Sequence, residues 1–372
     1  MTIAREERSH HSERITSRTT AGAVSIWLLT LLFAGPVAAQ IEKIRFGFGF
    51  PAVSPIIINF IVPTYLGYYK QEGLEVELIG LPGAPAVSAN IEQGRIEFGV
   101  GVPSFHLPVA AKGEMLGLVN FYEYTYPFKW SVAVRPDDAA QTLRDLNGKL
   151  IGVSGFGTSD FPVGKALFRL VGMDPDRDVQ WLVVGEGIPA GQALIRSAIA
   201  ALLHFDTGFG RIEAAGMKLR YLPLPNDVPK VGGFFIAAQR ATIEKRRKTA
   251  IGFARAVAKA SWFILENPEA AAYMFIQLYP EAAPRGMPLA EQIRNVAVPI
   301  VKRAPLYKPY EAGVKEIGRI SRAEWDDEIT FNGLQGKIAN PHALYTNDLI
   351  AEINQFDRQK IIDDAKAFKI PK

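Results

Sequence analysis

Short apolar runs recur along the chain, several of them followed by Gly or Pro, and predict buried strands. These runs occupy residues 44–50, 74–79, 96–100, 119–122, 130–134, 150–153, 179–184, 199–203 and 234–237. Between them, apolar residues at helical spacing predict helices at 56–69, 86–94, 108–112, 162–172 and 189–197. Strands that alternate with helices in this way predict an α/β fold whose sheets are mostly parallel.

This order of elements occurs twice. Residues Gly94–Phe98 and Ser197–Ala201 take the same place in the two halves, because each is a helix end that runs into a strand. We therefore expect two similar lobes, joined near residues 124–130 and 219–233 by links that act as a hinge. The expected domains are a leader at 1–39, the first part of lobe I at 40–128, lobe II at 129–222, and a return to lobe I with C-terminal helices at 223–372.

The C-terminal part of the chain is mainly amphipathic. Its apolar spacing predicts helices at 244–265, 268–279, 289–302, 309–320 and 347–369. Asn267 stands directly before Pro268, and Asn at the cap followed by Pro at the first helical position is typical of a helix start. We expect this helical part to complete the first lobe.

Residues 145–172 carry the clearest functional pattern. The apolar strand at 150–153 is followed by Gly155 and Gly157, which let the backbone turn sharply, and then by three possible N-caps at 158–160. A helix N-terminus offers free N–H donors and a partial positive charge, so it favours polar or anionic ligand groups. Turns of this kind also occur in α/β proteins without a ligand role, so this pattern alone leaves both interpretations open.

The candidate ligand site lies in the loops that follow the predicted strands. In open α/β sheets, ligands bind beyond the carboxyl ends of the strands. The residues expected to contact a ligand are therefore Phe50, Ser54, Gly83, Pro103, Ser104, Phe105, Trp130, Phe156, Thr158, Ser159, Asp160, Glu186 and Asp206.

The acidic members of this set are Asp160, Glu186 and Asp206, which could form a carboxylate cluster. The alternative is that Asp160 caps its helix and the other two are solvated loop acids. The predicted loops contain no Arg or Lys, and a carboxylate about 4 Å from an anion repels it by roughly 4 kcal/mol at an effective dielectric near 20. Together with the aromatic rings, this pattern predicts a neutral or cationic heterocycle such as a pyrimidine, with Asp160 or Glu186 accepting ring N–H groups.

Composition limits the chemistry further. The 42 Lys and Arg and the 38 Asp and Glu among the 372 residues are mixed along the chain, so no basic block indicates nucleic acid. The absence of cysteine excludes disulfides, thiolate nucleophiles and thiolate metal ligands. His106, His204 and His342 lack metal-ligand spacing, and Ser104 and Ser159 lack the pattern around a nucleophilic serine. We therefore expect no catalytic residue, no metal site and no cofactor.

Residues 1–39 have the composition of a secretory signal peptide. An Arg-containing polar segment precedes an apolar run at 21–34, and small residues at 36–39 offer a cleavage site before Gln40. An uncleaved anchor is the alternative, but the run is short for a membrane span of about 20 residues. We expect a soluble protein in the periplasm of a Gram-negative cell.

Four segments carry a family resemblance. They are Gly73–Leu78, Gly83–Gly99, Asp145–Gly152, and Trp262 with Asn267–Ala271. Their order and spacing resemble the periplasmic solute-binding proteins of ABC importers, in the branch for nitrate, sulfonate, taurine and thiamin-precursor pyrimidines, over about residues 42–370. One departure concerns the second lobe, because the family usually has an Asp near Ala200 after a Gly, and Ser197–Ala201 contains neither.

The resemblance implies a two-lobed periplasmic-binding-protein fold of type II that closes on a small molecule by a hinge. It implies a monomeric, non-catalytic protein that delivers this ligand, expected to be a thiamin-precursor pyrimidine, to an ABC permease and its ATPase at the inner membrane. A sulfonate-, taurine- or nitrate-binding protein is one alternative. A pyrimidine synthase of thiamin biosynthesis is an alternative of another class, but such enzymes bind pyridoxal phosphate through a lysine and carry a Cys-rich motif, and this chain has a leader and no cysteine.

Overall fold

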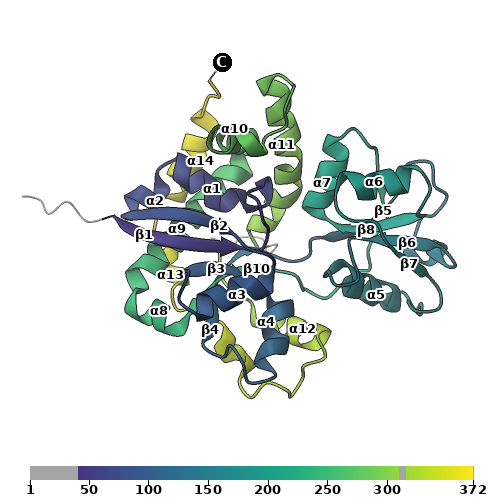
Figure 1. The fold of residues 1–372 in the computed structure, drawn as a ribbon, viewed down its shortest axis with the longest axis horizontal. Coiled ribbons are helices and arrows are strands. Elements are labelled where there is room, and N and C mark those ends of the chain that lie inside the picture. The colour runs from purple at the N-terminus through teal and green to yellow at the C-terminus, as the bar shows by residue number, and fades with distance from the viewer. Residues whose placement is uncertain (1–40, 310–315, 372) are drawn as a thin grey trace, which may run out of the picture. The chain divides into compact units, whose positions relative to one another are not determined.

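Two five-stranded sheets organise the computed structural model, which describes residues 41–309 and 316–371 (Figure 1). The strands are β1 (Glu42–Phe48), β2 (Leu74–Gly80), β3 (Phe98–Gly101), β4 (Leu118–Thr125), β5 (Trp130–Val134), β6 (Leu150–Val153), β7 (Gln180–Val183), β8 (Ala201–Phe205), β9 (Arg220–Tyr221) and β10 (Phe234–Gln239). The two sheets and their helices confirm the predicted two-lobed α/β fold. The leader expected at residues 1–39 lies outside the described residues.

Both sheets follow one pattern, with the orders β2-β1-β3-β10-β4 and β7-β6-β8-β5-β9. In each, the first three strands pair parallel and the last two pair antiparallel. Four of the five strands in each sheet therefore share one direction, and only β10 in the first sheet and β5 in the second run against it, which confirms the expectation of mostly parallel sheets. The reason for the two exceptions is the chain path, because β4 leads directly into β5 of the other sheet and β10 returns to the first, so β5 and β10 follow no helical crossover. The domain limits at residues 128 and 222 stay predictions.

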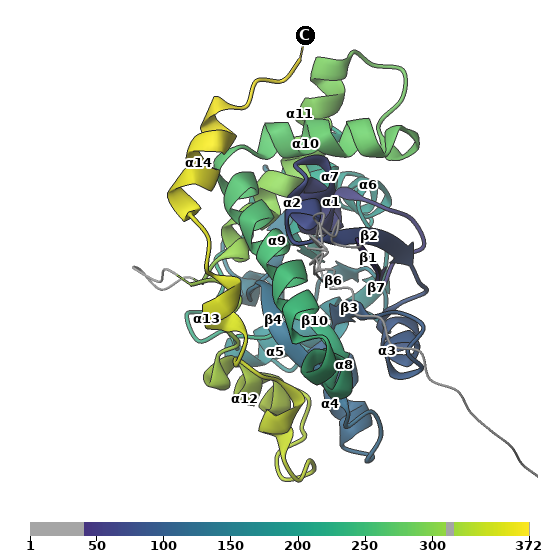
Figure 2. The ribbon, with the colours of Figure 1, turned by 90° about the vertical axis from the view of Figure 1, so that its left-hand side faces the viewer.

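The first lobe, defined here as the first sheet and the helices packed on it, contains the larger core. Stacked aromatic rings fill it, with ring centroids 4.1 Å apart for Phe46 and Phe60 and 4.9 Å apart for Phe98 and Phe253. The long α9 lies beside α1, α2, α13 and α14 (Figure 2). The helices of this lobe are η1 (Pro55–Ile57), α1 (Ile58–Tyr65), α2 (Tyr68–Gln71), α3 (Ala84–Glu92), α4 (Pro103–Ala110), α8 (Arg240–Lys245), α9 (Arg247–Glu266), α10 (Pro268–Leu278), η3 (Pro280–Ala282), α11 (Leu289–Arg303), η4 (Ala304–Tyr307), α12 (Arg322–Phe331), η5 (Pro341–Leu344), α13 (Ile350–Ile353) and α14 (Arg358–Ala367).

The second lobe is the second sheet with η2 (Leu143–Leu146), α5 (Asp160–Leu170), α6 (Ile188–Ile195) and α7 (Asp206–Ala214). Its helix α7 also packs on α11 of the first lobe. Gly210 makes this close approach possible, because a Cβ at this position would lie 2.5 Å from the Cα of Pro299. One flank of lobe II is therefore packed tightly against lobe I.

Several predicted helix limits differ from the structure. Helix α4 begins at Pro103 rather than at 108, because Pro is well tolerated in the first turn. The helix expected at 347–369 is two helices, since Asp357 accepts a hydrogen bond from the Lys360 N–H and so caps a new start at α14. The helix expected at 309–320 falls largely on residues 310–315, which lie outside the described residues, and 316–320 are not helical. Helices α7 and α12 were not predicted.

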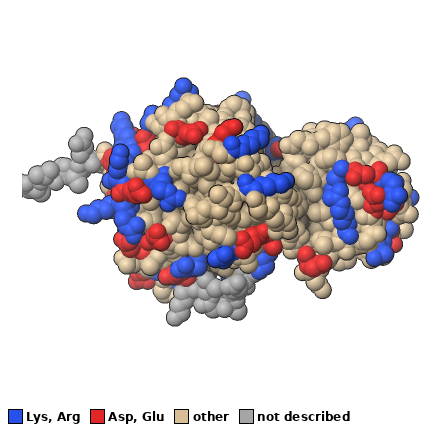
Figure 3. Space-filling view, turned by 90° about the horizontal axis from the view of Figure 1, so that it is seen from below, with Lys and Arg blue, Asp and Glu red and all other residues tan. Residues whose placement is uncertain are grey.

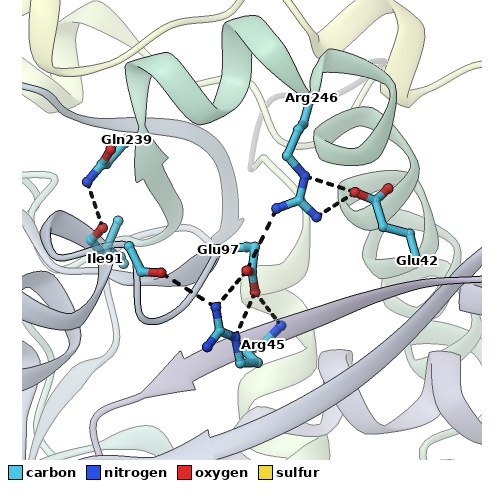
Figure 4. A network of polar contacts seen from close by, with 7 residues as sticks. Glu42, Arg45, Ile91, Glu97, Gln239 and Arg246 are labelled. Carbon is cyan, nitrogen blue, oxygen red and sulfur yellow. Dashed lines mark hydrogen bonds and ion pairs between the residues drawn. The ribbon is translucent and has the colours of Figure 1, made fainter.

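Exposed ion pairs lie at the amino end of the strands of the first sheet (Figure 4). Arg45 Nη2 lies 2.8 Å from Glu97 Oε1, and Arg246 Nε donates to Glu42 Oε1 at 2.8 Å. On the face drawn in Figure 3, positive and negative side chains are interspersed. Within the described ranges, no helix combines the length and the apolar character that a membrane crossing requires.

Candidate functional site

A cleft of about 660 Å³ lies where the carboxyl ends of the parallel strands of both lobes meet. Every sequence-predicted site residue except Ser54 and Asp206 lines it. These residues are Phe50, Gly83, Pro103, Ser104, Phe105, Trp130, Phe156, Thr158, Ser159, Asp160 and Glu186. The structure thus brings together loops that are far apart in the sequence, as the rule for open α/β sheets requires.

The two exceptions lie beside the cleft. Ser54 lines a neighbouring cavity, and Asp206 is turned toward Arg303 of α11, which itself lines the cleft. Both positions follow a strand end, but the strand-end rule does not give the direction in which a side chain points.

The sequence analysis missed part of the cleft wall. Lys129, Phe205, Phe234, Arg303, Glu328, Phe331 and Asn332 are among the residues that it did not identify. Lys129 and Phe234 belong to the amino ends of β5 and β10, and these ends reach the same edge of the sheet because the two strands run antiparallel to their neighbours. Arg303 and Glu328 come from α11 and α12. The expectation that no Arg or Lys faces the cleft is therefore wrong.

Asp160 is the centre of a buried polar cluster and is only 2% exposed. Its Oδ1 accepts a hydrogen bond from Trp130 Nε1 at 2.8 Å, and its Oδ2 accepts one from Ser154 Oγ. Burial alone would raise the pKa of this carboxyl, but the contacts with His204, Ser154 and Trp130 outweigh burial and hold the pKa below its usual range. Asp160 therefore makes no side-chain cap of its helix, and it holds the Trp130 ring in the cleft wall.

His204 completes this cluster but is poorly placed as a proton relay. Its Nδ1 lies 3.2 Å from Asp160 Oδ2 and 3.0 Å from Ser154 Oγ, while its Nε2 accepts the Gly187 N–H at 3.2 Å. The same ring nitrogen thus faces both the serine and the carboxylate, whereas a serine–histidine–aspartate triad uses opposite nitrogens. Because Ser154 is also buried, the arrangement indicates a structural network.

A second cluster surrounds the backbone of Gly232. Lys129 Nζ donates to the Gly232 carbonyl at 2.6 Å, and Glu328 Oε1 accepts the Gly232 N–H at 2.6 Å. The same ammonium lies 3.5 Å from the Phe234 ring centroid and 4.6 Å from the Trp130 ring centroid. Burial lowers the pKa of Lys129 to about 7 and raises the pKa of Glu328 to about 7.

Arg303 supplies a third charge, and its side chain is 2% exposed. Its guanidinium donates from Nε and Nη2 to both carboxylate oxygens of Asp206, a bidentate ion pair between α11 and the start of α7. Burial opposes this charge, but Asp206 outweighs that effect and raises the pKa of Arg303. The Nη1 group has no hydrogen-bond partner among the described residues.

The cleft therefore offers aromatic faces together with both donors and acceptors. Seven rings line it, from Phe50, Phe105, Trp130, Phe156, Phe205, Phe234 and Phe331. The charged side chains in its lining are Lys129, Arg303, Glu328, Glu186 and Asp160, and Ser104, Thr158, Ser159, Thr207 and Asn332 add neutral polar groups. Among the residues that the structure describes, no group of three or more acidic or histidine side chains could hold a metal ion.

Comparison with known proteins adds a family and a fold. The family model described as "NMT1/THI5 like" matches residues 54–271. None of the curated protein sequences matches the chain.

Among solved structures, the alkanesulfonate-binding protein SsuA of Xanthomonas axonopodis pv. citri, bound to MOPS, is 17% identical with a TM-score of 0.53 over 85% of this chain and 99% of that one. The periplasmic aliphatic sulphonate-binding protein SsuA of Escherichia coli is 16% identical with a TM-score of 0.55 over 84% and 98% of the two chains. The desulfurization enzyme DSZB is 12% identical with a TM-score of 0.52 over 84% and 98%. These likenesses show the fold.

Proposed function

Because this chain belongs to the NMT1/THI5-like family, we propose that it is the solute-binding component of an ABC importer. In this proposal it is exported to the periplasm, captures a small molecule in the cleft between its lobes, and delivers it to a membrane permease. The observation that carries the proposal is the cleft itself. Its volume of about 660 Å³ lies within the range of small-molecule sites, and its polar groups converge from both lobes.

The ligand that fits this cleft best is a flat heterocycle with both donor and acceptor groups, such as an aminopyrimidine. Phe156, which is 55% exposed, and the partly buried Phe50 and Phe105 offer rings for stacking on the cleft wall. A ring nitrogen could accept from the Nη1 of Arg303 or from Lys129, and an exocyclic amine could donate to Glu328. This assignment replaces the expected acceptor Asp160, whose oxygens are already occupied by Trp130, Ser154 and His204.

A sulfonate is the second candidate ligand. Two solved structures of similar fold are named as sulfonate-binding proteins. In this chain, Lys129 and the free Nη1 of Arg303 could hold an oxyanion. The bidentate pairing of Arg303 with Asp206 weighs against it, because the carboxylate already neutralises most of that charge.

An enzymatic role is the alternative of another class, and DSZB demonstrates that this fold can host catalysis. In this chain the one buried serine–histidine–aspartate cluster described above has the wrong geometry for a triad, and Ser154 does not line the cleft. We therefore assign binding, not catalysis, to the cleft.

Isothermal titration calorimetry on the chain that begins at Gln40 tests the proposal. The probes are 4-amino-5-hydroxymethyl-2-methylpyrimidine, taurine, butanesulfonate and nitrate. Binding of the aminopyrimidine alone supports the heterocycle, and binding of a sulfonate alone supports the second candidate. If none of the four binds, and no small molecule co-purifies with the protein by mass spectrometry, the solute-binding proposal is overturned.

A further inference from the structure

A second cavity of about 410 Å³ adjoins the ligand cleft. Ile56 and Thr207 line both spaces, so the two are direct neighbours and only these side chains need to be passed to go from one to the other. The walls of this side cavity come from η1 and the loop before it, from α6, α7, η3 and α11, and from the loop before α11. Its lining is mostly apolar and includes Val53, Pro55, Ile188, Ala214, Ala282, Met287 and Val296.

Thr207 stands at the junction of the two cavities. It is 1% exposed, and its Oγ1 has no hydrogen-bond partner among the described residues. A buried hydroxyl without a partner is costly, by about 1–3 kcal/mol. A polar atom of a ligand that passes from the cleft into the side cavity would satisfy it.

The walls of the side cavity are held in place by direct contacts between the lobes. Gly210 of α7 packs against Pro299 of α11, and Lys302 Nζ donates to Glu213 Oε1 at 2.8 Å. Arg211 is the one charged residue in the described lining, and it makes no ion pair with any described residue. The cavity therefore has mostly apolar walls, which the contacts between the lobes hold in place, and one positively charged side chain, Arg211, in its lining.

From these contacts we infer that the ligand is elongated, with a flat head in the cleft and an apolar arm in the side cavity. The arm leaves the head through a polar linking atom that accepts a hydrogen bond from Thr207. Arg211 disfavours a positively charged end on this arm and tolerates a neutral or acidic end. The inference rests on the proposed function, since it extends the same cleft to a class of larger solutes.

Calorimetry with two pairs of probes tests the arm separately from the head. One pair is the hydroxymethyl aminopyrimidine named above and its O-butyl ether, and the other is methanesulfonate and octanesulfonate. In the unmodified chain, each buried methylene of the arm should tighten binding about fourfold until the cavity is filled. Thr207→Val should weaken binding of the ether about fivefold more than it weakens binding of the unsubstituted aminopyrimidine.

Two variants that fill the side cavity provide the decisive comparison. Ala214→Trp blocks it from lobe II and Ala282→Trp blocks it from lobe I, whereas Ala198→Trp places the same ring at an exposed site outside both cavities. The gain from the arm should disappear in the first two variants and persist in the third, with unchanged binding of the short probes.

The two proposals fail in different ways. If no short or long probe binds and no small molecule co-purifies with the protein, the proposed function is wrong. If short probes bind but the arm adds no affinity, or if its gain survives both cavity-filling variants, the inferred arm site is wrong.

Discussion

Two groups of charged residues in this protein contribute differently to stability, because they differ in their exposure to solvent. The group at the amino end of the first sheet is partly exposed, with Arg45 at 42%, Arg246 at 31%, Glu42 at 40% and Glu97 at 15% side-chain exposure. Arg246 and Glu42 remain in contact with water, so this pair contributes at most about 1 kcal/mol. The group at the cleft is buried, and its Arg303–Asp206 pair is 2% and 12% exposed.

The comparison shows that the protein keeps several of its buried charges, which lower stability unless they are paired, at the cleft. A buried charge is tolerated only with a close partner, and Asp160, Asp206 and Arg303 each have one. Lys129 and Glu328 are held mainly by the backbone carbonyl and N–H of Gly232, and Lys129 also by two ring faces, so burial dominates and shifts both pKa values to about 7. Shifted pKa values in a cleft are typical of functional sites, in line with the proposed ligand cleft.

Breaking the buried pair should have the largest effect. Asp206→Asn leaves the Arg303 guanidinium buried without a counter-charge, so we expect the free energy of unfolding to fall by about 3–5 kcal/mol. Urea denaturation followed by circular dichroism measures this loss. Glu42→Gln removes a carboxylate from the exposed group and serves as the control, with an expected loss below about 1 kcal/mol. Equal losses in the two variants would contradict the contrast between the groups.

The substitution Gly232→Ala should have the next largest effect on stability. The φ of Gly232 is +87°, and a Cβ there would lie 2.1 Å from Cη2 of Trp130. Gly232→Ala should therefore cost the strain of a left-handed alanine, about 1–2 kcal/mol, and also displace the Trp130 ring. Gly216→Ala is the matched control, because its φ is +81° and nothing lies within 4 Å of the added methyl.

The two glycine variants should differ in binding as well as in stability. Denaturant unfolding should give a larger loss for Gly232→Ala than for Gly216→Ala. Calorimetry should give weaker ligand binding for Gly232→Ala alone, because only that substitution moves a ring of the cleft wall. If both variants lose the same stability and bind equally well, Trp130 is not held by this contact.

How much of the site the sequence could predict depends on the strand direction. Phe50, Pro103 and Phe156 follow parallel strands, so the rule that ligands lie beyond carboxyl ends placed them correctly in the cleft. Lys129 and Phe234 stand at the amino ends of antiparallel strands, and strand direction is not visible in an apolar run. The direct connection from β4 to β5, which contains no helix, is the signal that could have revealed the reversed strand direction.

Other features depend on tertiary contacts that no local pattern encodes. Arg303 and Glu328 lie on amphipathic helices, and only the packing of α11 and α12 brings them to the cleft. The fold itself was predictable, because the spacing of strands and helices and the repeat at Gly94–Phe98 and Ser197–Ala201 are local properties. The role of Asp160 could not be predicted, because its partners Trp130 and His204 are 30 and 44 residues away in the sequence.

Asp160→Asn tests this structural role. The amide keeps the size of the side chain, but its NH₂ group cannot accept from Ser154 and His204, so a buried donor would face other donors. We expect a loss of about 1–3 kcal/mol in the free energy of unfolding. Asp137→Asn, at a carboxylate with 86% side-chain exposure, is the control and should change stability little. Unchanged stability of Asp160→Asn would mean that the carboxylate does not organise the cluster.

The smallest expected effect is a pH dependence that separates the two ligand candidates. The pKa of Lys129 is lowered to about 7 and that of Glu328 is raised to about 7, so between pH 6 and pH 8 the first loses its positive charge and the second gains a negative one. An anion binds best to the protonated forms. Its affinity should therefore fall about tenfold over this interval, which is about 1.4 kcal/mol.

A heterocycle that is neutral over the same interval should show a much smaller change in affinity, because it carries no charge for the cleft to repel. Lys129→Met keeps a long apolar stem over the Phe234 ring and removes the charge, so it should flatten the pH profile of an anion. Lys112→Met, at an exposed lysine outside the cleft lining, should leave the profile unchanged. Calorimetry at pH 6, 7 and 8 in buffers of different ionisation enthalpy also measures proton uptake, which should accompany sulfonate binding at pH 7 and 8. A sulfonate that binds equally at all three pH values would show that Lys129 and Glu328 do not face the ligand.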